Sequence, residues 1–166
     1  MNQTAAVNRF PPPQHDHDDC VAAAIATAEV VCRERGLRFT GLRRRVLELV
    51  WDSHKPAGAY DILERLNRLG KRTAPPTVYR ALDFLIEAEL VHRLDSLNAF
   101  VGCPDPGSPH TGQFLICRQC RSVAELDDPE IDALVEKKAS ALGFTAVRQI
   151  IEIEGLCRNC SEARSG

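Results

Sequence analysis

The sequence predicts an α+β protein built from two unlike halves, and three observations support this prediction. Helical periodicity dominates the first half, two short strands close it, and a segment rich in proline and glycine follows. Beyond that segment, short strands surround one helix, and two Cys-x-x-Cys pairs each follow a strand. A chain of 166 residues is long enough for two small hydrophobic cores.

Four segments are expected along the chain: a disordered tail over 1–19, a helical domain over 20–101, a hinge over 102–112 and a smaller domain over 113–166. The tail contains PPPQHDHDD and has no apolar core, which argues against a secretory signal. The apolar stretch CVAAAIATAEVV is too short to span a bilayer. We therefore expect a cytoplasmic protein with no membrane partner, in which thiols stay reduced.

The first half contains signals for four helices. The first is expected from about Asp19 to Arg35, before Gly36 as its C′ residue, and Thr40 is the expected N-cap of the second. The third, AYDILERLNRLG, ends at Gly70. The fourth, APPTVYRALDFLIEAEL, carries prolines in its first turn, where the missing N–H groups cost nothing.

A hairpin is expected after the fourth helix, because VHRLDSLNAFV contains two short strands around a Ser-Leu-Asn turn. Helices followed by such a hairpin are typical of a winged helix-turn-helix, a DNA-binding fold. The charge distribution of the chain is consistent with a DNA-binding first half. The segment 29–80 holds 12 Lys and Arg against 6 Asp and Glu, whereas residues 96–166 hold 7 against 10. A basic first half favours an anionic partner for that half alone.

The fourth helix has one apolar face and one polar face. On a helical wheel the apolar face consists of Val78, Ala81, Leu82 and Leu85. Arg80 lies nearly opposite, with Thr77 on the outer side and Tyr79 on the flank. Tyr60, at the start of the third helix, is a second candidate for contact with DNA. Helix geometry alone leaves two interpretations open. The residues contact DNA, or Arg80 is an ordinary solvated arginine and Tyr60 is half-buried packing.

The second half is expected to begin with strand QFLIC and strand SVAEL, followed by a helix that Asp128 caps and that ends at Gly143. A final strand, AVRQIIEIEG, leads to the last Cys pair. The helix carries one apolar stripe, made of Ile131, Leu134, Val135 and Leu142. A unit this small is expected to need a metal ion, a partner subunit or both.

The two Cys-x-x-Cys pairs are Cys117/Cys120 and Cys157/Cys160, with 36 residues between them. Two such pairs complete a tetrahedral four-cysteine shell for a structural zinc ion. A redox dithiol would need one pair at the N-terminus of a helix in a βαβ unit, and we expect neither pair there. Inert thiols are the third interpretation.

The chain has seven cysteines, an odd number, which fits a disulfide framework poorly. Cys20 and Cys32 are expected to pack as small hydrophobic residues.

Four further candidate ligands flank the expected hinge: His92, Cys103, His110 and Glu125. Each has an ordinary explanation as a surface, loop or buried side chain. Together, two imidazoles, one thiolate and one carboxylate suit zinc, and the soft sulfur disfavours manganese and iron(II). Spacing alone does not decide between a second zinc site and four unrelated residues.

The segments PPTVYRALDFLIEAELVHRLDSLNAFVGC, HTGQFLICRQC and GLCRNC, taken together and in order, resemble the ferric uptake regulator superfamily, in particular its zinc uptake regulator branch. The resemblance covers about residues 25–160. It implies an N-terminal winged helix-turn-helix DNA-binding domain and a small C-terminal α/β dimerisation domain with a structural zinc held by four cysteines.

The resemblance also implies roles for individual residues. Cys117, Cys120, Cys157 and Cys160 match the structural zinc site, and His92, Cys103, His110 and Glu125 match the regulatory zinc site. Tyr60 and Arg80 match positions that contact operator DNA. Iron-sensing relatives carry a His-His-Asp-His cluster before the first Cys pair, whereas this chain has SPHTGQFLIC with a single histidine.

The function that this resemblance implies is a zinc-activated repressor of zinc-uptake genes that binds a palindromic operator as a homodimer. Two zinc ions per subunit and no enzymatic activity are expected. Three alternatives remain: a sensor of iron, manganese or peroxide in the same superfamily, a zinc enzyme with Glu125 as general base, and a purely structural zinc module.

Overall fold

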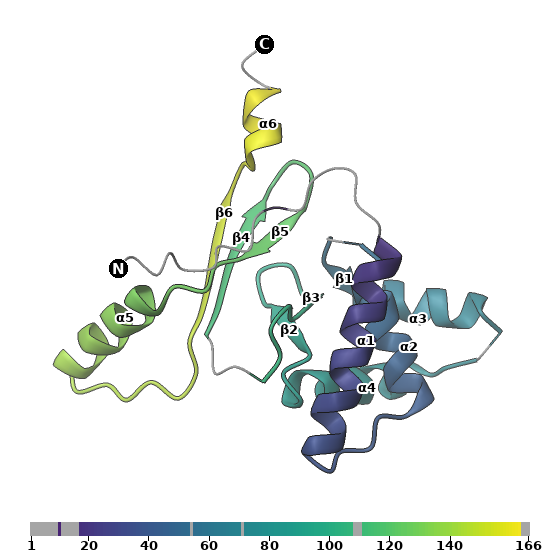
Figure 1. Ribbon diagram of the computed structural model, residues 1–166. Helices are drawn as coiled ribbons and strands as arrows, with labels where there is room; N and C mark the ends of the chain where they lie inside the picture. The colour runs from purple at the N-terminus through teal and green to yellow at the C-terminus, as the bar shows by residue number, and fades with distance from the viewer. Residues whose placement is uncertain (1–9, 11–16, 54, 71, 108–110, 164–166) are drawn as a thin grey trace. The chain divides into compact units, whose positions relative to one another are not determined.

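The computed structural model describes residue 10 and residues 17–53, 55–70, 72–107 and 111–163 (Figure 1). These residues form two compact units. The N-terminal unit comprises the described residues between 17 and 107, and the C-terminal unit comprises residue 10 with residues 111–163. Among the described residues, no helix has both the length and the apolar character that crossing a membrane requires.

Four helices and a small sheet build the N-terminal unit, as predicted (Figure 1). The Thr40 hydroxyl caps the second helix by accepting a hydrogen bond from the backbone N–H of Arg43 at 3.4 Å. Pro75 and Pro76 occupy the first turn of the fourth helix, where helical N–H groups have no partner in any case. The helices are α1 (His17–Glu34), α2 (Gly41–Trp51), α3 (Ala59–Arg68) and α4 (Pro75–Glu87).

The helices share one apolar core, to which α4 contributes the predicted face. Val78, Ala81, Leu82 and Leu85 are all buried. Cys32 lies in the same core, as expected for a small hydrophobic residue. The start of α1 differs from the prediction by two residues, because the helix begins at His17.

The hairpin after α4 forms the predicted pair β2 (Val91–Leu94) and β3 (Ala99–Gly102). A third strand, β1 (Ala57–Gly58), pairs with β3 and gives the sheet order β1-β3-β2. The sequence pattern does not predict β1, because two residues are too few to show any periodicity. The four helices and the β2–β3 hairpin, which is the wing, together make the winged helix-turn-helix that the sequence predicted.

The C-terminal unit is a three-stranded sheet with two helices outside it (Figure 1). Its strands have the order β5-β4-β6; β4 pairs antiparallel with β5 and parallel with β6. The elements are β4 (Gly112–Cys117), β5 (Val123–Glu125), α5 (Pro129–Ala141), β6 (Ile150–Gly155) and α6 (Arg158–Glu162). The predicted last strand starts four residues later than expected, because Gly112, the first residue of β4, pairs with Ile150.

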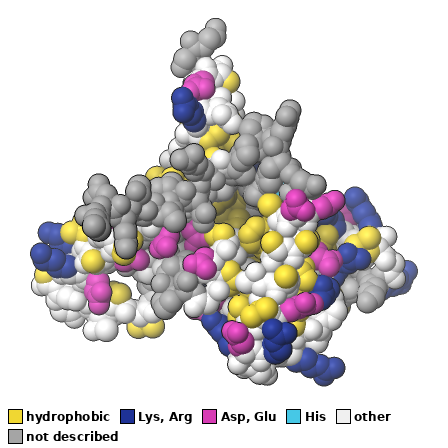
Figure 2. Space-filling view, in the orientation of Figure 1, with side chains coloured by type: hydrophobic (Ala, Val, Ile, Leu, Met, Phe, Trp, Pro, Cys, Tyr) yellow, Lys and Arg dark blue, Asp and Glu magenta, His cyan; other side chains and the backbone are white. Residues whose placement is uncertain are grey.

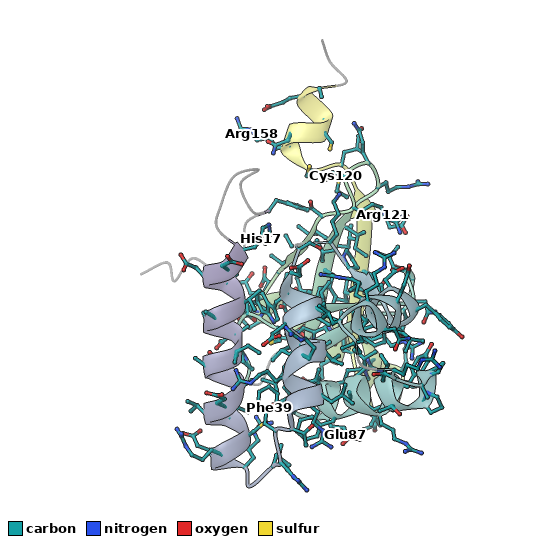
Figure 3. All side chains as sticks on the ribbon, turned by 90° about the vertical axis from the view of Figure 1, so that its right-hand side faces the viewer. His17, Phe39, Glu87, Cys120, Arg121 and Arg158 are labelled. Carbon is teal, nitrogen blue, oxygen red and sulfur yellow. The ribbon has the colours of Figure 1, made fainter. Side chains whose placement is uncertain are left out.

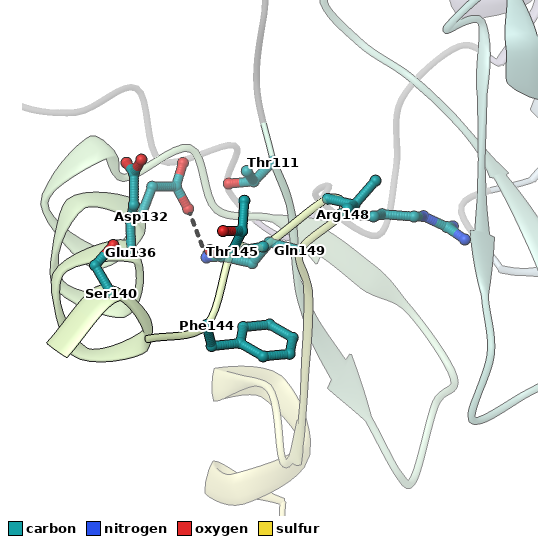
Figure 4. Close-up of a pocket in the computed structure, with 10 residues that line it drawn as sticks. Thr111, Asp132, Glu136, Ser140, Phe144, Thr145, Arg148 and Gln149 are labelled. Carbon is teal, nitrogen blue, oxygen red and sulfur yellow. Dashed lines mark hydrogen bonds between the residues drawn. The ribbon is translucent and has the colours of Figure 1, made fainter. Parts of the chain in front are cut away.

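A polar network attaches α5 to this sheet. The Asp132 carboxylate accepts hydrogen bonds from the side-chain amides of Gln113 on β4, at 2.6 Å, and of Gln149, at 3.0 Å. Figure 4 shows the bond from Gln149. Gln113 also donates to the backbone carbonyl of Asp128 at 3.0 Å, at the start of the helix. Asp132 and Gln149 line a cavity of about 270 Å³ between α5 and the segment that follows it.

The apolar stripe of α5 is not buried within this chain. No residue of the helix is buried, and Leu134 is 55% exposed. Leu142, just beyond the helix, is 86% exposed. Exposed apolar residues gathered on one face are typical of an interaction surface.

Candidate functional site

The two Cys pairs meet because the strands that carry them are parallel and in register. Cys117 ends β4 and pairs with Gly155, which ends β6. The backbone therefore leaves both strands at the same end of the sheet. The backbone N–H of Arg118 donates to the Gly155 carbonyl at 2.9 Å and continues the pairing past the strands. The second pair starts two residues after Gly155, at Cys157. Residues 40 positions apart are thereby brought to one place.

The four sulfur atoms have the spacing that a tetrahedral zinc ion needs. The Sγ atoms of Cys117, Cys120, Cys157 and Cys160 all lie within 4.8 Å of one another. The Sγ atoms of Cys120 and Cys157 are 3.8 Å apart. A Zn–S bond of about 2.3 Å in a regular tetrahedron requires sulfur atoms about 3.8 Å apart. The donor set and its spacing therefore fit zinc.

Hydrogen-bond donors around the site favour the thiolate form of the first pair. Burial opposes the ionisation of Cys117, but the backbone N–H groups of Cys157, Cys120 and Gln119 outweigh it and lower the pKa of Cys117 to about 6. The pKa of Cys120 is also lowered, mainly by the Ser122 hydroxyl, which lies 3.3 Å from its sulfur. The lowered pKa values of Cys117 and Cys120 therefore favour binding of a cation by the first Cys pair.

The surroundings of the second pair, Cys157/Cys160, instead favour the thiol form. Burial raises the pKa of Cys157, and burial together with the neighbouring cysteines raises the pKa of Cys160 to about 12. Four thiolates cannot accumulate here without a positive charge that compensates them. A divalent cation bound by all four supplies that charge and releases the remaining protons.

A short helix and one aromatic side chain complete the surroundings of the cysteines. Cys157 is the N-cap of the five-residue helix α6, Cys160 lies within this helix, and Cys120 lies close to its start in Figure 3. Phe10 packs against the cluster formed by the buried cysteines. The second pair does adjoin a helix N-terminus, but no strand follows α6 among the described residues, so this helix is not part of a βαβ unit. The redox interpretation still fits poorly, since four thiols converge here rather than two.

The four candidate regulatory ligands are divided between the two units. His92 lies half-buried on β2 of the N-terminal unit, and Cys103 follows β3 with its thiol buried. Glu125 is the last residue of β5 in the C-terminal unit and is buried too. His110 lies outside the described residues. The ligand set as a whole remains a prediction.

The candidate DNA contacts lie on the outer side of α3 and α4. Tyr60 is 70% exposed, which excludes the interpretation that it is half-buried packing. Arg80 and Tyr79 are exposed, and Thr77 is half-buried near the start of α4. Lys and Arg side chains gather along the outer margin of this unit in Figure 2.

Some arginines near the candidate DNA contacts are ion-paired with acidic side chains, and others are not. Arg65 pairs with Asp52, and Arg68 pairs with Glu64. Within the part of the chain that the structure describes, Arg80 and Arg72 form no ion pair. Arg72, just before α4, was not singled out from the sequence, since its neighbours show no helical period. Uncompensated charge at the start of this helix favours contact with phosphates.

Comparison with known proteins agrees with this architecture. The model of the ferric uptake regulator family matches residues 34–154. The zinc uptake regulation protein of Escherichia coli (strain K12) is 37% identical over 142 residues, which cover 85% of this chain and 83% of that protein. The chain belongs to the ferric uptake regulator family.

Solved structures of the ferric uptake regulator family extend the similarity. The crystal structure of holo XcZur is 44% identical and has a TM-score of 0.79; the match covers 84% of this chain and 98% of that one. A zinc uptake regulator complexed with zinc and DNA is 34% identical and has a TM-score of 0.82, with coverage of 92% and 100%. The family model ends before Cys157, so the assignment of the second Cys pair depends on the geometry described above.

Proposed function

We propose that this protein is a zinc-responsive transcriptional regulator that represses zinc-uptake genes when zinc is abundant. The observation that carries the proposal is the pairing of a winged helix-turn-helix with a four-cysteine metal site in one chain. The relatives support it, because the similar proteins are named zinc uptake regulators and one is complexed with both zinc and DNA. A regulator of this kind acts in the cytoplasm and is not an enzyme.

The DNA-reading surface is proposed to be the N-terminal part of α4. A recognition helix enters the major groove with its first turns, where Thr77, Tyr79 and Arg80 lie. Arg80 would bind a guanine edge or a phosphate, and Tyr60 on α3 would contact the backbone or a thymine methyl group. Asp83 and Glu87 lie later on the same helix, away from the phosphates that would repel them.

The regulatory site is proposed to take zinc through His92, Cys103, His110 and Glu125. A zinc ion bound by His92 and Cys103 would attach the N-terminal unit to Glu125 of the C-terminal unit and so favour one arrangement of the two. A hundredfold gain in operator affinity needs only about 2.7 kcal/mol of coupling. Four protein ligands also leave no open coordination position for catalysis.

A homodimer is proposed to form through the C-terminal unit. The uncovered face of α5, with Leu134 and Leu142, is suited to a second copy of the same surface. A twofold dimer places two recognition helices on two half-sites, so the operator is expected to be palindromic. One zinc ion in the four-cysteine site and one in the regulatory site give two per subunit.

A zinc titration of operator binding at buffered free metal tests the proposed function. Wild-type protein should bind operator DNA only above a threshold of free zinc, and Cys103→Ser should lose this response while keeping its fold. A wild-type response in C103S would remove Cys103 from the site. Activation by iron(II), manganese or peroxide in place of zinc would favour the alternative sensor within the family.

A further inference from the structure

The indole ring of Trp51 lies directly against Gly102, the residue that precedes Cys103. A Cβ atom placed on Gly102 would come within 2.1 Å of both Cε2 and Nε1 of the ring. Side chains do not tolerate such a distance, so no residue larger than glycine fits here while the ring keeps its place. The contact joins the last residue of α2 to the last residue of β3.

Both partners of this contact are held by rigid elements. Trp51 ends a helix whose inner face, including Leu47 and Val50, is buried in the core of the N-terminal unit. Gly102 pairs with Val91 in the β2–β3 ladder. The backbone N–H of Cys103 then donates to the Leu90 carbonyl at 3.0 Å. The strand end is therefore fixed by hydrogen bonds to β2 and by the ring of Trp51.

The same ring borders the cavity next to the Cys103 thiol. The cavity has a volume of about 200 Å³, and its lining includes Cys20, Leu47, Trp51, Leu90 and Cys103. The lining is mainly apolar, and Cys103 is only 3% exposed. Removing the indole would enlarge this space and allow the end of β3 to move into it.

We propose that Trp51 and Gly102 form a positioning pair for Cys103, which sets the geometry of the regulatory zinc site. The inference rests on the proposed role of Cys103 as a zinc ligand. A metal site binds tightly only when its ligands are held in place before the ion arrives, and residues behind the ligands commonly change metal affinity by about 10- to 100-fold. The ring acts through the backbone of Gly102 and does not touch the ion itself.

Three substitutions test the pair. Trp51→Ala removes the ring, Gly102→Ala keeps the ring but places a methyl group against it, and Trp51→Phe retains most of the contact. Zinc affinity is measured by competition with a fluorescent chelator, and operator binding is measured across buffered free zinc. We expect W51A and G102A to need about 10- to 100-fold more free zinc for half-maximal operator binding. W51F should stay near the wild-type value.

Gly41→Ala is the matched control, since it makes the same change in the first residue of α2, where a Cβ meets nothing within 4 Å. It should leave the zinc midpoint unchanged. At saturating zinc, all variants should bind operator DNA as tightly as wild type, because the reading surface of α4 is untouched. A merely structural role would instead weaken binding at saturating zinc and leave the midpoint in place, which would overturn the proposal.

The series also separates this inference from the proposed function. If C103S loses its zinc response while W51A and G102A keep wild-type midpoints, the positioning role is wrong and the zinc ligand stands. If C103S responds to zinc like wild type, the ligand assignment fails, and the positioning role fails with it. Should W51A lose helical structure by circular dichroism, G102A decides the question, because it retains the ring.

Discussion

Cysteine side chains in this chain differ in ionisation because their surroundings differ. Cys32 is buried in the core of the N-terminal unit, and burial raises its pKa. Cys117 is equally buried, but three backbone N–H groups point at its sulfur and its pKa falls to about 6. Desolvation alone favours the thiol, whereas directed N–H groups favour the thiolate. These surroundings suit Cys32 to packing and Cys117 to binding a metal ion.

Alkylation of the zinc-loaded protein should follow this difference. At a pH of about 7.5, Cys32 should stay unmodified by iodoacetamide, because a raised pKa leaves it as the unreactive thiol and the core excludes the reagent. Cys20, which is half-buried and outside the four-cysteine site, should be modified first. Peptide mass spectrometry gives the order. Modification of Cys32 before Cys20 in folded protein would contradict this assignment.

At the scale of elements, α4 and the β4–β6 pair perform separate tasks. The apolar face of α4 is buried in the core of its unit and its opposite face presents Arg80 to solvent. The parallel pairing of β4 with β6 brings the two Cys pairs together, although the second half of β6 is exposed and provides little core. Since the second half of β6 has so little buried surface of its own, we expect a metal ion bound at its end to stabilise the strand pair.

Replacing Arg80 by alanine should weaken operator binding by about 1–3 kcal/mol at saturating zinc, the value of a good arginine contact to DNA. Fluorescence anisotropy with a labelled operator provides the measurement. Arg68→Ala is the matched control, because the charge of Arg68 is already paired with Glu64. Equal losses in R80A and R68A would show that only net charge matters.

Cys117→Ser should disrupt the C-terminal unit. The variant should lose the structural zinc, so that metal analysis finds at most one ion per chain, and it should dissociate in analytical ultracentrifugation. The physical reason is that three thiolates and a hydroxyl bind zinc far more weakly than four thiolates. Cys20→Ser is the control and should retain both ions. A dimeric C117S with wild-type zinc content would rule out the four-cysteine assignment.

At the scale of the whole molecule, the exposed apolar surface of the C-terminal unit favours the proposed dimer. Leu134 is 55% exposed on α5, a helix with no buried residue, and Leu142, just beyond the helix, is 86% exposed. A second copy that covers this face would also double the number of reading helices. Metal, dimer and operator are then thermodynamically linked, so operator DNA should tighten zinc binding by the factor by which zinc tightens operator binding.

Leu142→Asp should weaken the dimer by about tenfold or more, because each twofold interface would bury two unpaired carboxylates. Affinity for a palindromic operator should fall, while affinity for a single half-site should change little. Sedimentation velocity and anisotropy measure the two effects. Leu69→Asp, on an exposed leucine of the N-terminal unit, is the control and should leave the dimer intact. An unchanged sedimentation coefficient for L142D would exclude this face as the interface.

Sequence patterns alone were sufficient to predict the helices of the N-terminal unit, the buried face of α4, the hairpin and the four cysteines that the structure brings together. Each depends on residues close together in the chain: a 3.6-residue period, the Thr40 cap, the Pro75–Pro76 start, or the x-x spacing of a knuckle. The two-residue strand β1 and the short helix α6 were missed, because they have no period of their own.

Tertiary structure alone decided which distant groups meet. Parallel pairing of β4 with β6 places the two Cys pairs at one end of a sheet, and the Ser122 hydroxyl and Phe10 join them there. The ring of Trp51 contacts Gly102 only because α2 packs beside β3, and no local sequence pattern predicts that contact. Local propensity acts over a few residues, whereas packing and strand register depend on the whole folded chain, and the functional geometry of this protein comes from the latter.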